Sequence, residues 1–401
     1  MLYALGASAT LQEAQVNLLQ EQGHVRRGET RKQFGAPVKV RQAVFEDYDQ
    51  IAALQLRNGL TIRSREDWVA LWKGNPVYEA SSVPWPIGWV LEARDGEIVG
   101  SIGNLPFVYH FRGRELRVGS PCGWAVDPQY RIYSLLIFGR FLKQKEVDLF
   151  IFSTVGPRAA PVANALQLDR APVGQWHKSA FWITNYRRFS EAVLGAKSVW
   201  LGAVMIYPVS AALFCWDKFR AVRIPEGGST LEIELCSEFD RRFDEFWEEL
   251  KRQKDGVLLA GRTQQTLRWH FRNTPQRPAT WILGVLEGSR LTAYAIFDRS
   301  DSAFGLKRVR LVDFQALSGS EEALGVTLRW MLSRCREDGI HVLEVTGCWL
   351  NRPGLPRIVV PYCRTLPSWT YYYKAREKRL SEALRDPAVW APSSFDGDSS
   401  L

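Results

Sequence analysis

The alternation of apolar and polar positions predicts a chain that mixes strands and helices. Residues 88–126 contain three strand-like runs separated by turn signals at Asp95-Gly96 and Arg112-Gly113, which predicts an antiparallel meander. Residues 148–154, DLFIFST, form a nearly continuous apolar run that is typical of a buried strand. With a strand and a helix over 38–60 and helical segments at 133–144 and 159–168, the first half predicts strand, helix, meander, helix, strand, helix, strand.

The second half repeats this order of elements without repeating the sequence. A strand over 229–237 precedes an amphipathic helix, whose apolar side carries Phe239, Phe243, Phe246, Trp247 and Leu250. A hairpin turning at Glu287-Gly288, a strand over 307–317, a helix ending at Gly339 and a strand over 340–347 follow. The fold class predicted is α/β, in the α+β sense of a mixed sheet. Two tandem domains, 38–190 and 228–378, would each hold a largely antiparallel mixed sheet flanked by helices.

Three segments lie outside these two domains. Residues 1–37 predict a flexible basic arm with a helix over 7–20, and residues 379–401 a polar tail that is loosely packed or docked by Trp390. Residues 191–227 predict an apolar connector helix, within which 199–216 has no charge over 18 residues. That length is near the lower limit for a membrane span, but Pro208 and several small residues favour a helix buried between domains or lying on a membrane surface.

Composition and charge narrow the class of partner. The net charge of +9 and the pI near 9.3 favour anionic partners, while the absence of any run of five Lys or Arg argues against nucleic acid. The six cysteines form no CxxC pair and the five histidines are scattered, so we expect reduced thiols and no metal. The first residues lack the basic start of a signal peptide, which favours a cytoplasmic protein.

The strand-to-helix joint after residue 125 carries a recognisable motif. Residues 126–131, VDPQYR, resemble the V-x-P-x-Y-R signature of the GNAT acyltransferase superfamily, which continues as x-x-G-x-G/A. Residues 41–54 look like the family's first strand and helix, and residues 91–100 look like the hairpin between its second and third strands. Residues 267–297 look like the same region of another copy. The resemblance covers about 38–190 and 228–375, so the chain is similar to a tandem GNAT protein.

The resemblance implies that acyl-CoA is the co-substrate. In this family the pyrophosphate of CoA binds free N–H groups at a helix start, and the pantetheine arm lies between two splayed strands. The matching positions here are Trp124, Val126, Arg131, Ile132, Tyr133, Ser134, Leu135 and Leu136. Ser134 and Leu136 replace the two glycines: Ser134 is small, whereas Leu136 is expected to narrow the loop. The alternative is a joint that packs well and no longer binds CoA.

The second copy has no such motif after Val312-Asp-Phe, so it is expected to act as a scaffold or substrate platform. For catalysis the resemblance implies a base, a main-chain N–H that stabilises the oxyanion and an acid for the leaving thiolate. The sequence singles out no catalytic residue. The candidates are Cys122, which is better explained as a buried small side chain, Glu92 and Tyr133.

The function predicted is transfer of an acyl group from acetyl-CoA, another acyl-CoA or an acyl-carrier protein to an amine or hydroxyl. The acceptor would be a small molecule, a sugar or a peptide. One alternative is a FemAB-like transferase, which resembles paired GNAT domains and uses aminoacyl-tRNA. The other is a degenerate GNAT pair that acts as a binding or assembly module, with peripheral membrane contact through 199–216.

Overall fold

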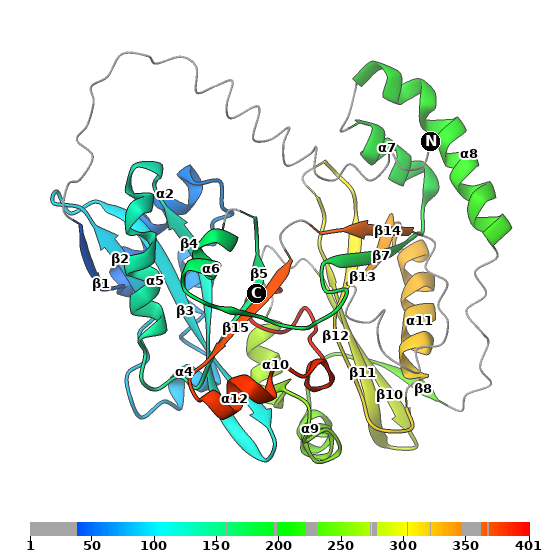
Figure 1. The fold of residues 1–401 in the computed structure, drawn as a ribbon. Helices are drawn as coiled ribbons and strands as arrows, with labels where there is room; N and C mark the ends of the chain where they lie inside the picture. Colours follow the sequence, from blue (N-terminus) through cyan, green and yellow to red (C-terminus); the bar gives the residue numbers. More distant parts are fainter. Residues whose placement is uncertain are drawn as a thin grey trace.

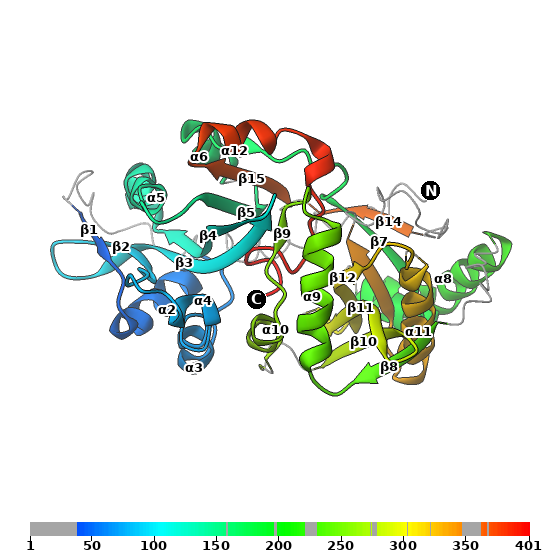
Figure 2. The ribbon, with the colours of Figure 1, turned by 90° about the horizontal axis from the view of Figure 1, so that it is seen from below.

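The computed structural model contains two mixed sheets that lie side by side, with the C-terminal segment between them in both views (Figures 1 and 2). It describes residues 38–157, 159–195, 199–220, 231–272, 274, 279–302, 304–320, 322–346, 362–366 and 369–401, and of 199–203 and 220 the main chain alone. The predicted arm and its helix over 7–20 lie outside these residues. The predicted fold class, mixed sheets flanked by helices, is confirmed.

The first sheet has eight strands in the order β1-β2-β3-β4-β5-β15-β6, and β9 pairs with β3. The bounds are β1 Lys39–Gln42, β2 Gly88–Glu92, β3 Ile98–Phe111, β4 Arg114–Val126, β5 Leu149–Val155, β6 Asp169–Arg170, β9 Leu259–Ala260 and β15 Thr370–Ala375. The meander β2-β3-β4 is antiparallel as predicted. Its second turn needs left-handed backbone at Arg112 (φ 50°) and Gly113 (φ 70°), the geometry of a two-residue hairpin loop.

The second sheet has seven strands in the order β14-β7-β13-β12-β11-β10-β8. The bounds are β7 Lys178–Ile183, β8 Glu232–Cys236, β10 Thr280–Glu287, β11 Arg290–Arg299, β12 Arg308–Ala316, β13 Val342–Thr346 and β14 Tyr362–Thr365. Strands β8, β10, β11, β12 and β13 occupy the places that β1, β2, β3, β4 and β5 hold in the first sheet. The predicted repeat of architecture is therefore present in the order of strands.

The two halves of the chain exchange a strand. β7 comes from the first half and pairs with β13 and β14 of the second sheet, whereas β15 comes from the second half and pairs with β5 and β6 of the first. Residues 38–190 and 228–378 therefore each contribute to both sheets, and the division into domains at these bounds stays a prediction. Local sequence patterns specify a strand but not the strand that it pairs with.

Helices cover the outer faces of the sheets and fill the space between them (Figure 2). The bounds are α2 Tyr48–Arg57, α3 Arg65–Val69, α4 Pro76–Glu79, α5 Ser134–Leu142, α6 Ala160–Ala165, α9 Arg241–Gln253, α10 Gln264–His270, α11 Ala323–Glu337 and α12 Lys378–Ala383. The predicted apolar side of α9 is buried, with Phe243, Phe246, Trp247 and Leu250 facing the core. α9 and α10 lie between the two sheets in both views (Figures 1 and 2).

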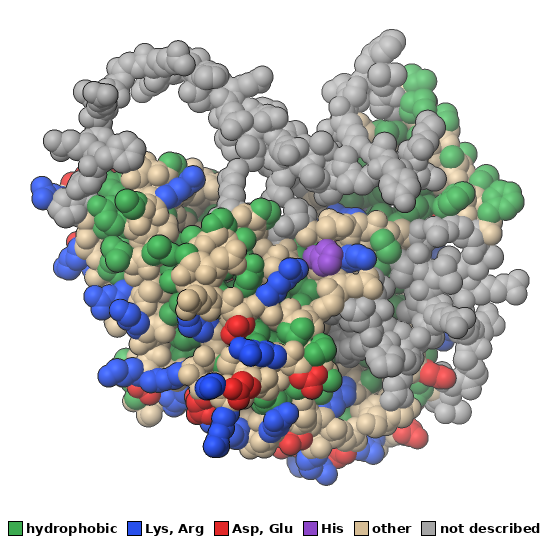
Figure 3. All heavy atoms as spheres, viewed as in Figure 1, with side chains coloured by type: hydrophobic (Ala, Val, Ile, Leu, Met, Phe, Trp, Pro, Cys, Tyr) green, Lys and Arg blue, Asp and Glu red, His purple; other side chains and the backbone are tan. Residues whose placement is uncertain are grey.

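The predicted connector forms a helical hairpin at one end of the molecule (Figure 1). α7 (Tyr186–Gly195) packs against α8 (Val199–Arg220), which buries Leu213 but leaves Val204, Tyr207 and Phe219 exposed. An exposed hydrophobic region lies over α8 at the upper right of Figure 3. No helix among the described residues is long and apolar enough to cross a membrane. Residues 196–198 and 221–227 of the predicted connector lie outside the described part of the chain.

The tail is docked rather than loosely packed. The Trp390 ring lies 5.5 Å from that of Tyr371 and 5.3 Å from that of Tyr373, both on β15. Beyond Trp390, residues 392–397 are buried, and the chain ends between the two sheets. The tail therefore contributes to the interior of the molecule, where the cavities described next are found.

Candidate active site

Strands β4 and β5 separate shortly after they begin to pair. They form parallel pairs at Val118 with Leu149 and at Gly119 with Phe150, and no further pair between these two fully described strands. A β-bulge in β4 bends the strand at this point, because Ser101 pairs with Ala125 while Gly103 pairs with Cys122. The facing edges of β4 and β5 therefore leave main-chain groups that a ligand could pair with.

A cavity of about 320 Å³ occupies the space between the separated strands, and we call it the gap cavity. Its walls are aromatic: the Trp124 ring lies 5.1 Å from that of Phe138, which stacks 5.5 Å from Phe152. Residues 153–155 of β5, Gly156 directly after it, and Ala159 and Ala163 at α6 also line the cavity. An elongated apolar group with one or two polar atoms suits such a space.

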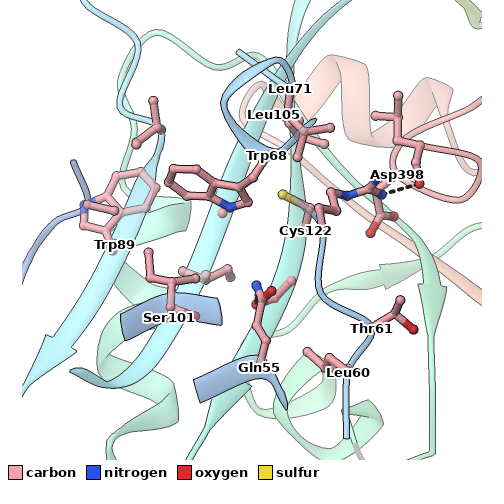
Figure 4. Close-up of a pocket in the computed structure, with 18 residues that line it drawn as sticks. Gln55, Leu60, Thr61, Trp68, Leu71, Trp89, Ser101, Leu105, Cys122 and Asp398 are labelled. Atoms are coloured by element: carbon pink, nitrogen blue, oxygen red, sulfur yellow. Dashed lines mark hydrogen bonds between the residues drawn. The ribbon is translucent and has the colours of Figure 1, made fainter. Parts of the chain in front are cut away.

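A second cavity of about 220 Å³ lies over the face of β2, β3 and β4, and we call it the face cavity (Figure 4). Trp68, Trp89 and Gln55 are among its lining side chains. The Gln55 amide donates to the main-chain oxygen of Gly123 at 3.1 Å, which holds α2 against the bulge. The two cavities meet because both are lined by Leu60, Cys122, Gly123 and Asp398.

Asp398 is the ionisable group at this junction (Figure 4). It accepts a hydrogen bond from Ser153 Oγ on β5 at 3.2 Å. Burial raises the pKa of its carboxyl from 3.8 to about 6, although the bond from Ser153 acts in the opposite direction. A carboxylate with this pKa is mostly ionised at pH 7 and still basic enough to accept a proton from a reacting group.

A buried network holds the tail that carries Asp398. Arg262 Nε lies 2.9 Å from Asp313 Oδ2, and the Arg262 guanidinium also donates to Ser393 Oγ at 3.3 Å. The next residues turn back because Asp396 accepts a hydrogen bond from the Ser393 N–H at 2.5 Å. Gly397 has φ 66°, and a Cβ there would lie 2.9 Å from Ser153 Oγ. The glycine therefore lets the tail approach β5 closely enough for Asp398 to reach the junction.

Cys122 lines both cavities, but its thiol is not activated. Burial, and then the nearby Asp398 carboxylate, raise its pKa from 9.0 to about 12. The side chain therefore stays protonated at neutral pH, which argues against a thiolate nucleophile and leaves it able to donate a weak hydrogen bond. The described residues contain no group of three or more His, Cys, Asp or Glu that could hold a metal ion.

The other two catalytic candidates lie outside both cavities. Glu92, at the end of β2, accepts a hydrogen bond from Arg41 Nε, and Arg41 also pairs with Asp47 at 2.7 Å. These contacts give Glu92 a structural role. Tyr133 ends the 3₁₀ turn Pro128–Tyr133 and packs, half buried, against the core.

The predicted cofactor motif forms the joint between β4 and α5. Trp124 lines the gap cavity and Val126 lies in the core, while Arg131 and Ile132 are exposed on the 3₁₀ turn. The Leu136 side chain is 53% exposed and lines neither cavity, and its expected narrowing of the loop stays a prediction. The helical phase explains this exposure: Ser134, Ile137, Phe138 and Phe141 face the sheet, which turns Leu135 and Leu136 towards solvent.

Sequence reasoning missed Asp398 and its partner Ser153. Ser153 was part of an apolar run and Asp398 part of a polar tail, so neither stood out. The signal was the segment Phe395-Asp-Gly-Asp398, since a large apolar residue and a glycine between two acids favour a docked turn over a solvated tail.

Comparison with known proteins adds the fold family. No protein-family model matches the chain, and no curated protein matches it. A GCN5-related N-acetyltransferase from Anabaena variabilis has a similar structure, with a TM-score of 0.51 and 13% identity over 84% of this chain and 73% of that chain. The N-myristoyltransferase of Saccharomyces cerevisiae with bound myristoyl-CoA is similar over 86% of this chain and 84% of its own, with a TM-score of 0.51 and 11% identity. At these identities the likeness shows the fold alone: the chain has the fold of the GNAT acyltransferase superfamily.

Proposed function

We propose that the protein transfers an acyl group from an acyl-CoA to an amine or hydroxyl acceptor. The observation that carries this proposal is the gap cavity between β4 and β5, with a half-buried carboxylate where it meets the face cavity. One of the similar structures contains myristoyl-CoA, which supports a CoA thioester as the donor. An acyl-carrier protein would present the same phosphopantetheine arm and stays an alternative donor.

In this proposal the pantetheine arm lies in the gap cavity and pairs with the open edges of β4 and β5. The pyrophosphate binds near the 3₁₀ turn and the start of α5, where N–H groups and the positive end of the helix dipole favour anions. Ser134 is buried at the first position of α5 and leaves the approach to the main chain unobstructed. Arg131, exposed on the turn, adds a positive charge beside the phosphates.

The acceptor enters through the face cavity and meets the thioester at the junction. Asp398 accepts the proton from the acceptor as its nitrogen or oxygen attacks the thioester carbonyl. A main-chain N–H of β4 near the bulge stabilises the oxyanion. The C–S bond then breaks, and CoA leaves as a thiolate that takes up a proton, so the acylated acceptor and free CoA are the products.

The direct test is binding of acetyl-CoA, longer acyl-CoAs and free CoA, measured by calorimetry and thermal shift. We expect saturable binding with one site per chain, because the gap cavity found between described strands lies in the first sheet. No stabilisation at saturating concentrations of any of these ligands would overturn the proposal. It would favour the alternative of a degenerate GNAT pair that acts as a binding or assembly module.

An aminoacyl-tRNA-dependent transferase is the alternative enzyme. A FemAB-like, aminoacyl-tRNA-dependent transferase would bind tRNA with steep salt dependence, which separates it from an acyl-CoA enzyme. The cytoplasmic location and a peripheral contact of 199–216 with a membrane also stay predictions, and the exposed apolar side chains of α8 are the residues to test for that contact.

A further inference from the structure

A third cavity, of about 180 Å³, lies between the second sheet and the tail, and we call it the arginine cleft. Four arginines from four separate segments line it: Arg63 before α3, Arg272 after α10, Arg299 at the end of β11 and Arg310 on β12. Hydroxyl groups supply most of the remaining polar lining, from Thr274, Ser300, Ser394, Ser399 and Ser400. Such a mixture of guanidinium and hydroxyl donors suits a multiply charged oxyanion.

The positive charge continues beneath the cleft. Glu344 on β13 is 1% exposed and is shared by three arginines, with Arg308 at 3.1 Å, Arg310 at 3.4 Å and Arg364 in direct contact. Burial, followed by repulsion from Arg310, lowers the pKa of Arg308 from 12.5 to about 10. One carboxylate is therefore too little to neutralise the guanidinium groups gathered around it.

A count of the described charges gives the same result. The cleft and the cluster beneath it hold six arginines, namely Arg63, Arg272, Arg299, Arg308, Arg310 and Arg364. The carboxylates beside them are Asp298, Asp301 and Glu344, of which Asp301 pairs with Arg299 at 2.8 Å, and Asp398, which interacts with Arg63 across the face cavity. Six positive groups against four negative ones leave an excess of two charges that a bound anion would balance.

The arginine cleft connects to the proposed reaction site. Arg63 and Leu401 line both this cleft and the face cavity, and the Arg63 guanidinium donates to the main-chain oxygen of Leu401. A ligand that extended from the cleft past Arg63 would therefore enter the face cavity, which Asp398 also lines. The face cavity is the route by which the acceptor enters in the proposed function.

We propose that the arginine cleft binds a phosphoryl group, a phosphate monoester or diphosphate, carried by the small-molecule acyl acceptor. The assignment to the acceptor rests on the proposed function, whereas the anion site rests on the cleft alone. A phosphoryl group is favoured over a single carboxylate because it carries up to two negative charges and three acceptor oxygens, which match the charge excess and the several donors.

The test measures inorganic pyrophosphate binding by calorimetry on the full chain. The wild type is expected to bind it saturably, and the double variant Arg272→Gln/Arg299→Gln to bind it at least ~10-fold more weakly, since two charge-assisted contacts are lost. The matched control is Arg334→Gln on α11, which loses an arginine paired with Asp338 at 2.8 Å, as Arg299 is paired with Asp301. Equal affinity in all three proteins, or no binding to the wild type, would overturn the anion site.

Two further arms separate this inference from the proposed function. Acetyl-CoA should bind the wild type and the double variant equally and should not be displaced by pyrophosphate; displacement would place the anion site on the donor side and overturn its assignment to the acceptor. If pyrophosphate binds but acetyl-CoA does not, the proposed function fails and the anion site stands without the acceptor. If the wild type binds total tRNA but not pyrophosphate, and the double variant binds neither, the cleft serves a nucleic acid instead. Melting temperatures of the variants check that each is folded.

Discussion

Each sheet contains a pair of parallel strands at the same point in its strand order, but the two pairs differ in structure. In the first, β4 and β5 pair at two positions and then separate around an apolar cavity walled by Trp124, Phe138 and Phe152. In the second, β12 and β13 pair at four positions, from Arg308 with Val342 to Leu311 with Val345. The second pair also carries buried charges, since Glu344 and Asp313 both lie on it.

This difference shows how one architecture supports two chemistries. An apolar gap with open strand edges suits the arm of a thioester, which has amide groups to pair and little charge. The second strand pair instead carries buried ion pairs, and its excess of arginines offers a surface for an anion. The sequence-based expectation that the second half serves as a substrate platform agrees with this division and stays a prediction.

The largest effect should follow from breaking the ion pair that holds the tail against the second sheet. Arg262 and Asp313 are 2% and 0% exposed, and Tyr294 also donates to Asp313 at 2.9 Å. Arg262→Met leaves the Asp313 carboxylate buried without its cation, so we expect a loss of about 3–5 kcal/mol in the free energy of unfolding. Chemical denaturation measures it.

The control for this variant removes both charges. Arg262→Met with Asp313→Leu should recover much of the lost stability, because no unpaired charge remains in the interior. A single variant as stable as the wild type would mean that the tail is held by its aromatic contacts instead, such as Trp390 on Tyr371.

The next effect concerns the carboxylate that the tail brings to the first sheet. With a small primary amine as acceptor, Asp398→Asn should lower the rate of CoA release from acetyl-CoA by about 100- to 1000-fold, because no base remains to accept the proton. The affinity for acetyl-CoA should stay unchanged. A thiol reagent follows the released CoA, and Asp386→Asn in the same tail, where Asp386 caps the 3₁₀ turn Pro387–Val389, serves as control.

The pH dependence of both rate and stability checks the same carboxyl. Its pKa is raised to about 6 in the folded protein, so the rate should rise with pH up to about 6 and then level off. Because the folded state holds this proton more tightly than the unfolded state, the contribution of Asp398 to stability falls as pH rises from about 4 to about 6. Asp398→Asn should therefore be more stable than the wild type by about 1–3 kcal/mol at pH 8 and show little difference at pH 3.

The elements of the fold could be predicted from local patterns. Strong turn signals at Gly96, Gly113 and Gly288, and the four apolar residues of α9, each act within a few positions of the chain. The exchange of β7 and β15 could not be predicted in this way, because both strands look alike to a local pattern. Only the packing of the whole chain decides which sheet each one joins.

The same distinction between local pattern and packing applies to the candidate site. The VDPQYR motif located the strand-to-helix joint and Trp124, because the motif is contiguous in the sequence. Asp398, Ser153 and the arginine cleft depend on residues that come together only when the tail docks between the sheets. The exposure of Leu136 likewise depends on how α5 packs on the sheet, which the motif alone does not show.

A smaller effect should follow from filling the gap cavity without changing its charge. Ala159 lines the cavity, and the variant Ala159→Trp places there a side chain large enough to occupy the space of the pantetheine arm. The affinity for acetyl-CoA should fall about 10- to 100-fold, as expected for an overpacked site. Ala211→Trp places the same side chain on the exposed face of α8 and should leave the affinity unchanged. Equal affinity in both variants would remove the gap cavity from the donor site.

The smallest effect concerns the phosphate end of the donor, where the main chain rather than a side chain is expected to do most of the binding. Arg131 is exposed, so its contact with a phosphate is weakened by solvent, and Arg131→Gln should lower the affinity for CoA only about 2- to 5-fold. The change should shrink as salt is added and should be absent for acetyl-pantetheine, which lacks the pyrophosphate. Arg140→Gln, near the other end of α5, is the matched control. A 2- to 5-fold loss that is equal for CoA and acetyl-pantetheine would mean that the pyrophosphate does not bind at the start of α5, even if the arm lies between β4 and β5.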